Sequence, residues 1–123
     1  MTVELPPSLI RFIRASVPTY QAAEVLLFLA AHPERALTAD EIVASMKPAA
    51  LTVPAARRYL ALFLSHELIV EREGGFAYRP ASGDVARAIA ELADAYNERP
   101  VTLIKVIATM TDGGIATTGF TSK

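Results

Sequence analysis

The sequence lacks several features that would tie it to a particular compartment. None of its 123 residues is cysteine, so disulfides and thiolate metal sites are excluded, and the absence fits a reducing compartment. The amino terminus lacks the early basic residues and the long apolar segment of a secretory signal. The most apolar run, residues 22–31, is half as long as the roughly twenty residues of a membrane-spanning helix. We therefore expect a soluble, cytoplasmic protein.

The chain also has no excess of positive charge. Twelve Lys and Arg side chains against thirteen Asp and Glu give a formal net charge of −1, which argues against strong, non-specific binding of nucleic acid. The charge is unevenly distributed, however. Residues 1–46 carry three basic and five acidic side chains, and residues 81–123 carry four and five. Residues 47–80 carry five basic and three acidic side chains, so this segment alone is net positive.

The patterns that indicate catalysis or a bound cofactor are missing as well. No Ser/His/Asp constellation, paired-carboxylate motif or phosphate-binding glycine loop is present, and Gly113-Gly114 is not followed by Lys-Ser/Thr. The two histidines, His32 and His66, lie far apart and have no carboxylates at metal-ligand spacing. We predict that the protein is not an enzyme and uses neither a cofactor nor a metal.

Length and composition favour one folded domain. Because 52% of the residues are apolar and 20% are charged, most of the chain is expected to fold, and 123 residues suffice to bury a core. The domain is predicted to cover residues 1–110. Residues 111–123 are rich in Gly, Thr and Ser and keep no hydrophobic period, which predicts a flexible tail.

Hydrophobic spacing predicts six helices. The first covers about residues 8–16, and the second follows Thr19 as its N-cap. This second helix is apolar nearly all round, as is typical of a helix at the centre of a domain or a dimer. Thr38 and Glu41 have the spacing of a capping box and begin the third helix. The other helices are predicted at about residues 52–66, 82–97 and 100–110.

Two short β-prone runs predict a hairpin over about residues 68–80. "LIVERE" and "FAYRP" flank Gly74-Gly75, and paired glycines are typical of the primed hairpin turns, which need positive φ. The chain is therefore expected to be mainly α-helical with a small β-hairpin.

A basic pair precedes this hairpin within a recognisable succession. The residues that form the succession are Ala56, Arg57, Arg58, Leu60, Phe63, Leu68, Ile69 and Val70. With the order helix, short helix, turn, longer helix and hairpin over about residues 19–80, it resembles the winged helix-turn-helix domain of bacterial transcriptional regulators, in a MarR/ArsR-like layout. Glu67 departs from the pattern, because that family commonly has glycine there. The preceding helix must then use another cap or place Glu67 in a left-handed conformation.

The resemblance implies a fold and a function. The fold would be a winged helix-turn-helix with extra amino- and carboxyl-terminal helices, at about residues 8–16, 82–97 and 100–110. The helix at about 52–66 would be the recognition helix, which enters the major groove of double-stranded DNA, and the hairpin would be the wing. The protein would regulate transcription by occupying an operator.

The same resemblance implies which side chains would contact DNA. Thr52, at the start of the recognition helix, would donate to phosphate, and Arg57 or Arg58 would contact guanine or phosphate. Arg72 and Arg79 would contact phosphate from the wing. The residues alone also allow these arginines to be solvated surface charges, and Glu71 and Glu73 on the wing would repel phosphate.

Two further interpretations stay open for the function. Leu62, with Ala55 and Ala61, falls towards the side that a DNA-facing helix exposes, and an apolar side there favours a protein contact or additional core. The alternative function is accordingly a winged-helix protein–protein interaction module without DNA binding. A third hypothesis is ligand sensing between the winged domain and its terminal helices.

The last predicted helix has a broad apolar surface. The residues that form it are Val101, Leu103, Ile104, Val106 and Ile107. In related winged-helix regulators such terminal helices often form the dimer interface, and two-fold symmetry places two recognition helices about one DNA turn apart. A homodimer through the terminal helices is expected, and the alternative is that these helices cover the core of a monomer.

Overall fold

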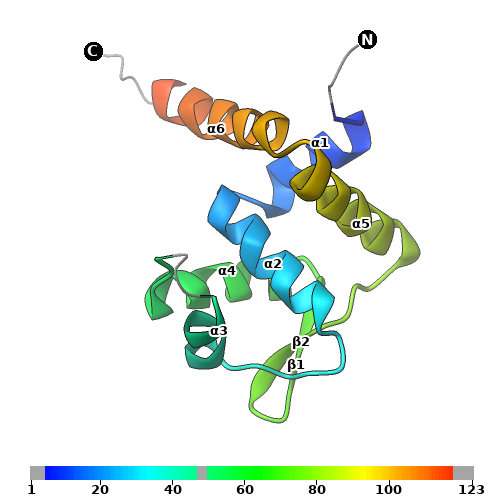
Figure 1. Cartoon of the computed structure of the whole chain (residues 1–123), viewed down its shortest axis with the longest axis vertical. Coiled ribbons are helices and arrows are strands. Elements are labelled where there is room, and N and C mark those ends of the chain that lie inside the picture. Colours follow the sequence, from blue (N-terminus) through cyan, green and yellow to red (C-terminus); the bar gives the residue numbers. More distant parts are fainter. Residues whose placement is uncertain (1–4, 47–49, 118–123) are drawn as a thin grey trace.

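The computed structural model describes residues 5–46 and 50–117, which fold into six helices and one two-stranded antiparallel sheet (Figure 1). The elements are α1 (Pro7–Ser16), α2 (Tyr20–Ala31), α3 (Ala39–Ser45), α4 (Val53–Ser65), β1 (Ile69–Arg72), β2 (Gly75–Tyr78), α5 (Gly83–Glu98) and α6 (Pro100–Thr117). The prediction of a mainly helical chain with a small hairpin is confirmed. No helix of the described residues is long and apolar enough to cross a membrane.

Helix α2 lies in the middle of the molecule. Figure 1 shows α3, α4 and the hairpin on one side of it and α1, α5 and α6 on the other. Its side chains Val25, Leu26 and Leu29 are fully buried, and the helix packs against α4, α5, α6 and β2. Because α2 is apolar nearly all round, it can serve both groups of elements at once. One continuous core, with residues from every helix and from β1, results.

The helix starts follow the expected capping chemistry. Four helices of the described chain begin after a Thr or Ser whose hydroxyl accepts a hydrogen bond from a backbone amide three residues on: Thr19, Thr38, Thr52 and Ser82. At α3 the predicted capping box is complete, because the Glu41 Oε1 atom accepts from the Thr38 amide at 2.8 Å. Each cap satisfies an amide that the helix itself leaves without a partner.

Helix α4 ends two residues before Glu67, the position where the winged-helix family commonly has glycine. Glu67 has φ 63°, the left-handed conformation predicted for it as one of two possibilities. The Glu67 amide donates to the Leu64 carbonyl and the Leu68 amide to the Phe63 carbonyl, at 3.0 and 2.9 Å. These two bonds form a Schellman motif, which reverses the chain into β1. The two carbonyls it satisfies offset the steric cost of a Cβ atom at positive φ.

The hairpin forms where it was predicted, but its turn is shifted by one residue. Arg72 pairs with Gly75, so the turn residues are Glu73 and Gly74, both with positive φ, and not Gly74-Gly75. Gly75 instead lies in β2, against the segment that precedes α3. Leu37 and Phe76 exchange two backbone hydrogen bonds there, at 2.9 and 2.8 Å. The second glycine therefore permits a close approach of two backbones.

Helix α6 continues to Thr117, where the sequence predicted a flexible tail from residue 111. Extending an existing helix adds a hydrogen bond for each residue without a new nucleus, so two helix-disfavouring glycines, Gly113 and Gly114, do not end it. Its carboxyl-terminal part projects beyond the other helices (Figure 1). The rest of the predicted tail, residues 118–123, lies outside the described residues.

We expect Gly75→Ala to destabilise the fold by about 1–3 kcal/mol, the usual cost of overpacking. The new Cβ atom would lie 2.9 Å from backbone atoms of Leu37, so the hairpin and the segment before α3 would have to separate. Equilibrium unfolding in urea measures the change. Gly83→Ala is the matched control, because a Cβ atom there meets nothing within 4 Å and the residue begins a helix. Equal stability of the two variants would contradict this role of Gly75.

Candidate functional site

The basic pair predicted to contact DNA lies on the exposed face of α4. Arg57 and Arg58 are both exposed, and helical spacing places them in one stripe with Pro54, Ala61 and Ser65, which we call the α4 stripe. The opposite face anchors the helix in the core through three buried side chains, Ala56, Leu60 and Phe63. The helix is therefore fixed by one face and free to bind with the other.

Thr52 stands at the start of α4 and acts as its N-cap. Its Oγ1 atom accepts a hydrogen bond from the Ala55 amide at 3.2 Å, and the side chain is exposed. A hydroxyl that accepts through a lone pair keeps its own proton, so Thr52 can still donate to an anion.

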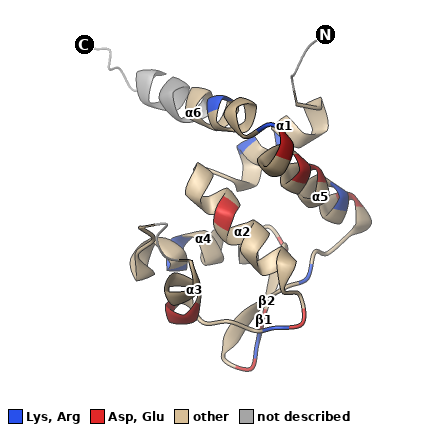
Figure 2. Ribbon diagram, viewed as in Figure 1, with Lys and Arg blue, Asp and Glu red and all other residues tan. Residues whose placement is uncertain are grey.

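The hairpin arginines are exposed but differ in their surroundings. The Arg72 Nη2 atom donates to the Glu34 carbonyl at 3.0 Å, which ties β1 to the segment between α2 and α3. Arg79 follows β2, and its backbone amide donates to the Leu68 carbonyl at 3.1 Å. Figure 2 shows acidic and basic residues mixed along this hairpin, where Glu71 and Glu73 are exposed too. The hairpin therefore carries no excess of positive charge, in contrast to the α4 stripe.

The apolar side of α4 is smaller than its sequence indicated. Ala55 is only 8% exposed and belongs to the core of its own chain, so it does not lie on the DNA-facing side, and of the two interpretations additional core holds for it. Leu62 is half-buried, and Ala61 is exposed. Helix α3 packs against α4 and covers part of its surface. The surface of α4 that stays accessible includes the α4 stripe and part of Leu62.

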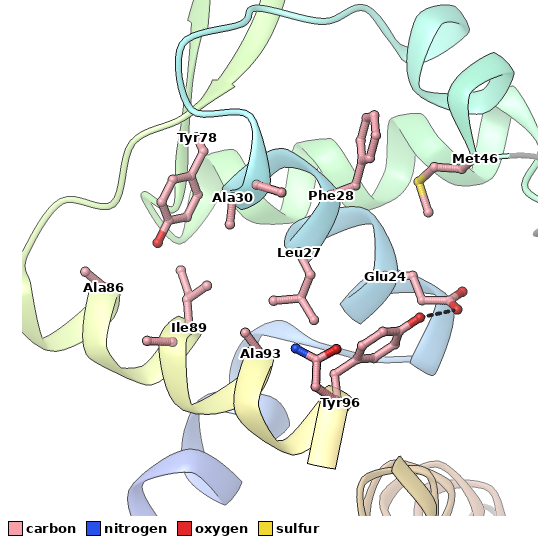
Figure 3. A pocket seen from close by; sticks show the side chains of 13 residues that line it. Glu24, Leu27, Phe28, Ala30, Met46, Tyr78, Ala86, Ile89, Ala93 and Tyr96 are labelled. Carbon is pink, nitrogen blue, oxygen red and sulfur yellow. Dashed lines mark hydrogen bonds between the residues drawn. The ribbon is translucent and has the colours of Figure 1, made fainter. Parts of the chain in front are cut away.

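A groove of about 680 Å³ opens between α2, α5, β2 and the end of α3 (Figure 3). Most of the described residues that line it are apolar: Leu27, Phe28, Ala30, Ala31, Met46, Ala86, Ile89, Ala90 and Ala93. Four polar residues complete the lining: Glu24, Tyr78, Tyr96 and Asn97. Sequence reasoning did not find this site, because its residues come from four elements and form no local motif. The alanines at 86, 90 and 93 recur at helical spacing on α5. This row of small side chains is the feature of the sequence that could have indicated a space between α5 and a neighbouring helix.

A carboxylate and a tyrosine occupy one end of this groove, and a second tyrosine stacks on the first. The Tyr96 hydroxyl donates to the Glu24 Oε2 atom at 3.0 Å, and the rings of Tyr20 and Tyr96 stack with centroids 5.4 Å apart. Burial, with a further contribution from the Glu24 contact, raises the pKa of Tyr96 to about 12. Burial and the charge of Glu24 also raise the pKa of Tyr20. The Tyr96 phenol is thus a proton donor to Glu24 over the whole physiological range.

Groups suited to metal binding are absent from the described residues, in which no three His, Cys, Asp or Glu side chains converge. The two surfaces that remain as candidate sites are the α4 stripe, which is basic, and the groove, which is apolar with one carboxylate. The charge of the first surface and the shape of the second both suit them to binding.

We expect Glu24→Gln to lower the pKa of Tyr96 without returning it to the ordinary value of 10, because burial is the larger cause. As the pH rises, the Tyr96 phenol loses its proton in the unfolded wild-type chain at a lower pH than in the folded protein, because its pKa is raised only in the folded protein. The stability that Tyr96 contributes is therefore complete below about pH 10 and is lost as the pH rises towards 12. Tyr96→Phe should weaken that alkaline loss. Titration of the tyrosine ring signals by NMR measures each pKa, and an unchanged value for Tyr96 in Glu24→Gln would contradict the contact.

Comparisons with known proteins assign the chain to no family. No family model matches it, and no match was found among curated proteins or solved structures. The function therefore has to be inferred from the chemistry of the α4 stripe, the hairpin and the groove.

Proposed function

We propose that the chain is a winged-helix transcriptional regulator that binds double-stranded DNA through α4, as a homodimer. The observation that carries the proposal is the exposed Arg57-Arg58 pair in the amino-terminal half of a helix whose other face is buried in the core. In a helix-turn-helix protein this part of the second helix contacts the base edges. The order α3, α4 and hairpin supports the same assignment, with α3 as the first helix and the hairpin as the wing.

The proposed mechanism is occupancy of an operator, with no chemical step. Arg57 and Arg58 would contact guanine or phosphate, and the Thr52 hydroxyl would donate to a phosphate beside them. Arg79 would add a phosphate contact from the hairpin. Arg72 would contribute less, because its guanidinium is held by the Glu34 carbonyl.

The charge of the chain limits the affinity of this proposed complex. Residues 47–80 carry a net charge of +2 from five basic and three acidic side chains. Strong binders neutralise about six to ten phosphates. A dimer doubles the number of contacts, so the complex would be of modest affinity and sensitive to salt.

The exposed side of α6 supports the dimer. Val101 is 62% exposed and Ile104 is 44% exposed, and Ala108 follows them at helical spacing. The opposite side of the helix is held in the core by Leu103 and Ile107. Pairing with the same stripe of a second copy would remove both large apolar side chains from water.

The alternative function, a protein–protein interaction module without DNA binding, loses part of its basis. Ala55 is buried within the chain, so only Ala61 and a fraction of Leu62 are left as an apolar surface on α4. Recognition of a protein through α4 would then have to use the same arginines. The basic pair therefore favours DNA.

The double variant Arg57→Ala/Arg58→Ala is expected to lose about thirtyfold or more in affinity for an operator, since each specific arginine contact contributes about 1–3 kcal/mol. The slope of log K against log salt should fall by about two as well. Fluorescence anisotropy with labelled duplexes measures both quantities. The control is Arg11→Ala/Arg14→Ala, which removes the same charge from exposed positions of α1. Equal losses in the two double variants would show that α4 does not read DNA.

Ile104→Glu is expected to convert the dimer to a monomer, because an interface that buried this position would then bury an unpaired carboxylate. The position is exposed in the single chain, so the fold should survive. Sedimentation velocity measures the assembly state and circular dichroism the fold. Ala44→Glu, on the exposed side of α3, is the control with the same added charge. A dimer that persisted in Ile104→Glu would rule out this side of α6 as the interface.

A further inference from the structure

The groove between α2 and α5 has the dimensions of a small-molecule site. Its volume of about 680 Å³ falls within the roughly 300–1,000 Å³ usual for ligand pockets. The alanines of α5 create the space, since they face the larger Leu27 side chain of α2 without filling the gap between the helices. An apolar body of moderate size would therefore be removed from water on several sides.

The charge in the groove determines what kind of molecule would fit. Of the described residues that line it, Glu24 alone carries a charge, and Figure 3 shows it beside Tyr96 at one end of the groove. The Oε2 atom of Glu24 is occupied by the Tyr96 hydroxyl, which leaves Oε1 to accept from a ligand. A carboxylate beside apolar walls is stabilised by a cation and would repel an anion.

The aromatic side chains favour the same ligand chemistry. Phe28, Tyr78 and Tyr96 line the groove from α2, β2 and α5, and of these three rings Figure 3 shows Tyr96 beside Glu24. A cation over an aromatic face is attracted by the negative potential of the ring. Because Tyr96 stays protonated to high pH, its hydroxyl continues to orient the Glu24 carboxylate.

We propose that this groove binds a small organic cation, an aromatic or aliphatic body that carries a protonated amine, with Glu24 as its counter-ion. The apolar body lies along Leu27, Ile89 and Ala93, and the amine donates to the Glu24 carboxylate. Tyr78 belongs to β2 and Met46 follows α3, so the groove borders the hairpin and the end of α3. The binding site does not depend on whether α4 binds DNA.

Three ligands with one ring system test the proposal on the full chain. The probes are 1-naphthylmethylamine, the neutral 1-naphthalenemethanol and the anionic 1-naphthoate, each titrated by calorimetry and by thermal unfolding. We expect the amine to bind at least about tenfold tighter than the alcohol, to raise the Tm as its concentration increases, and to shift the NMR signals of the groove alanines. The carboxylate should not bind. Equal binding of amine and carboxylate, or no binding of any probe, would overturn the proposal.

Two variants and one control locate the site. Glu24→Gln keeps the size of the side chain and its contact with Tyr96, and it should reduce the affinity for the amine to that for the alcohol. Ala93→Phe should abolish binding of both, because the new ring fills the groove. Glu91→Gln, on α5 but outside the groove lining, removes a carboxylate and should leave binding unchanged. Full affinity for the amine in folded Glu24→Gln would refute the role of Glu24, whatever the behaviour of Ala93→Phe.

Discussion

Burial of α2 is the interaction on which the other features depend. Each of its fully buried large side chains, such as Leu26 and Leu29, contributes about 1.5–3 kcal/mol relative to exposure, and the helix packs against α4, α5, α6 and β2. Because one helix supplies the contact surface for both groups of elements, α4 cannot move far relative to α5 without disturbing the core. The positions of the α4 stripe and of the groove both follow from this packing.

The two surfaces have opposite chemistry, and this difference separates their proposed roles. The α4 stripe presents Arg57 and Arg58 to solvent on a helix held by its other face, which suits a large anionic partner. The groove has apolar walls and the Glu24 carboxylate at one end, which suits a small cation. The hairpin carries mixed charges and borders the groove through Tyr78. The contribution of the hairpin to DNA affinity is therefore proposed to be minor.

Local chemistry made much of the fold predictable. The capping box at Thr38 and Glu41 was predicted from spacing alone, since both hydrogen bonds lie within four residues. The missing glycine at the end of a helix left two possibilities for Glu67, and the left-handed conformation is the one observed. The turn at Glu73 and Gly74 was placed one residue too late, because the role of Gly75 depends on Leu37, which is distant in the sequence.

The site was less predictable than the fold, for the same reason. The exposure of Arg57 and Arg58 follows from helical periodicity, whereas the bond of Arg72 to the Glu34 carbonyl joins segments far apart in the chain. Ala55 was assigned to the wrong face because its burial depends on the core around α4. The groove required the spatial arrangement of four elements, and only the alanine spacing on α5 hinted at it.

DNA binding by the wild-type chain is the central claim, and its most direct test is selection from a mixed pool of fragments of its own genome, at low and at near-physiological salt. The account predicts that a few fragments are retained at the higher salt and that they share two half-sites related by two-fold symmetry, about one helical turn apart. No retention of any fragment even at low salt would contradict it, because electrostatic contacts are strongest under that condition.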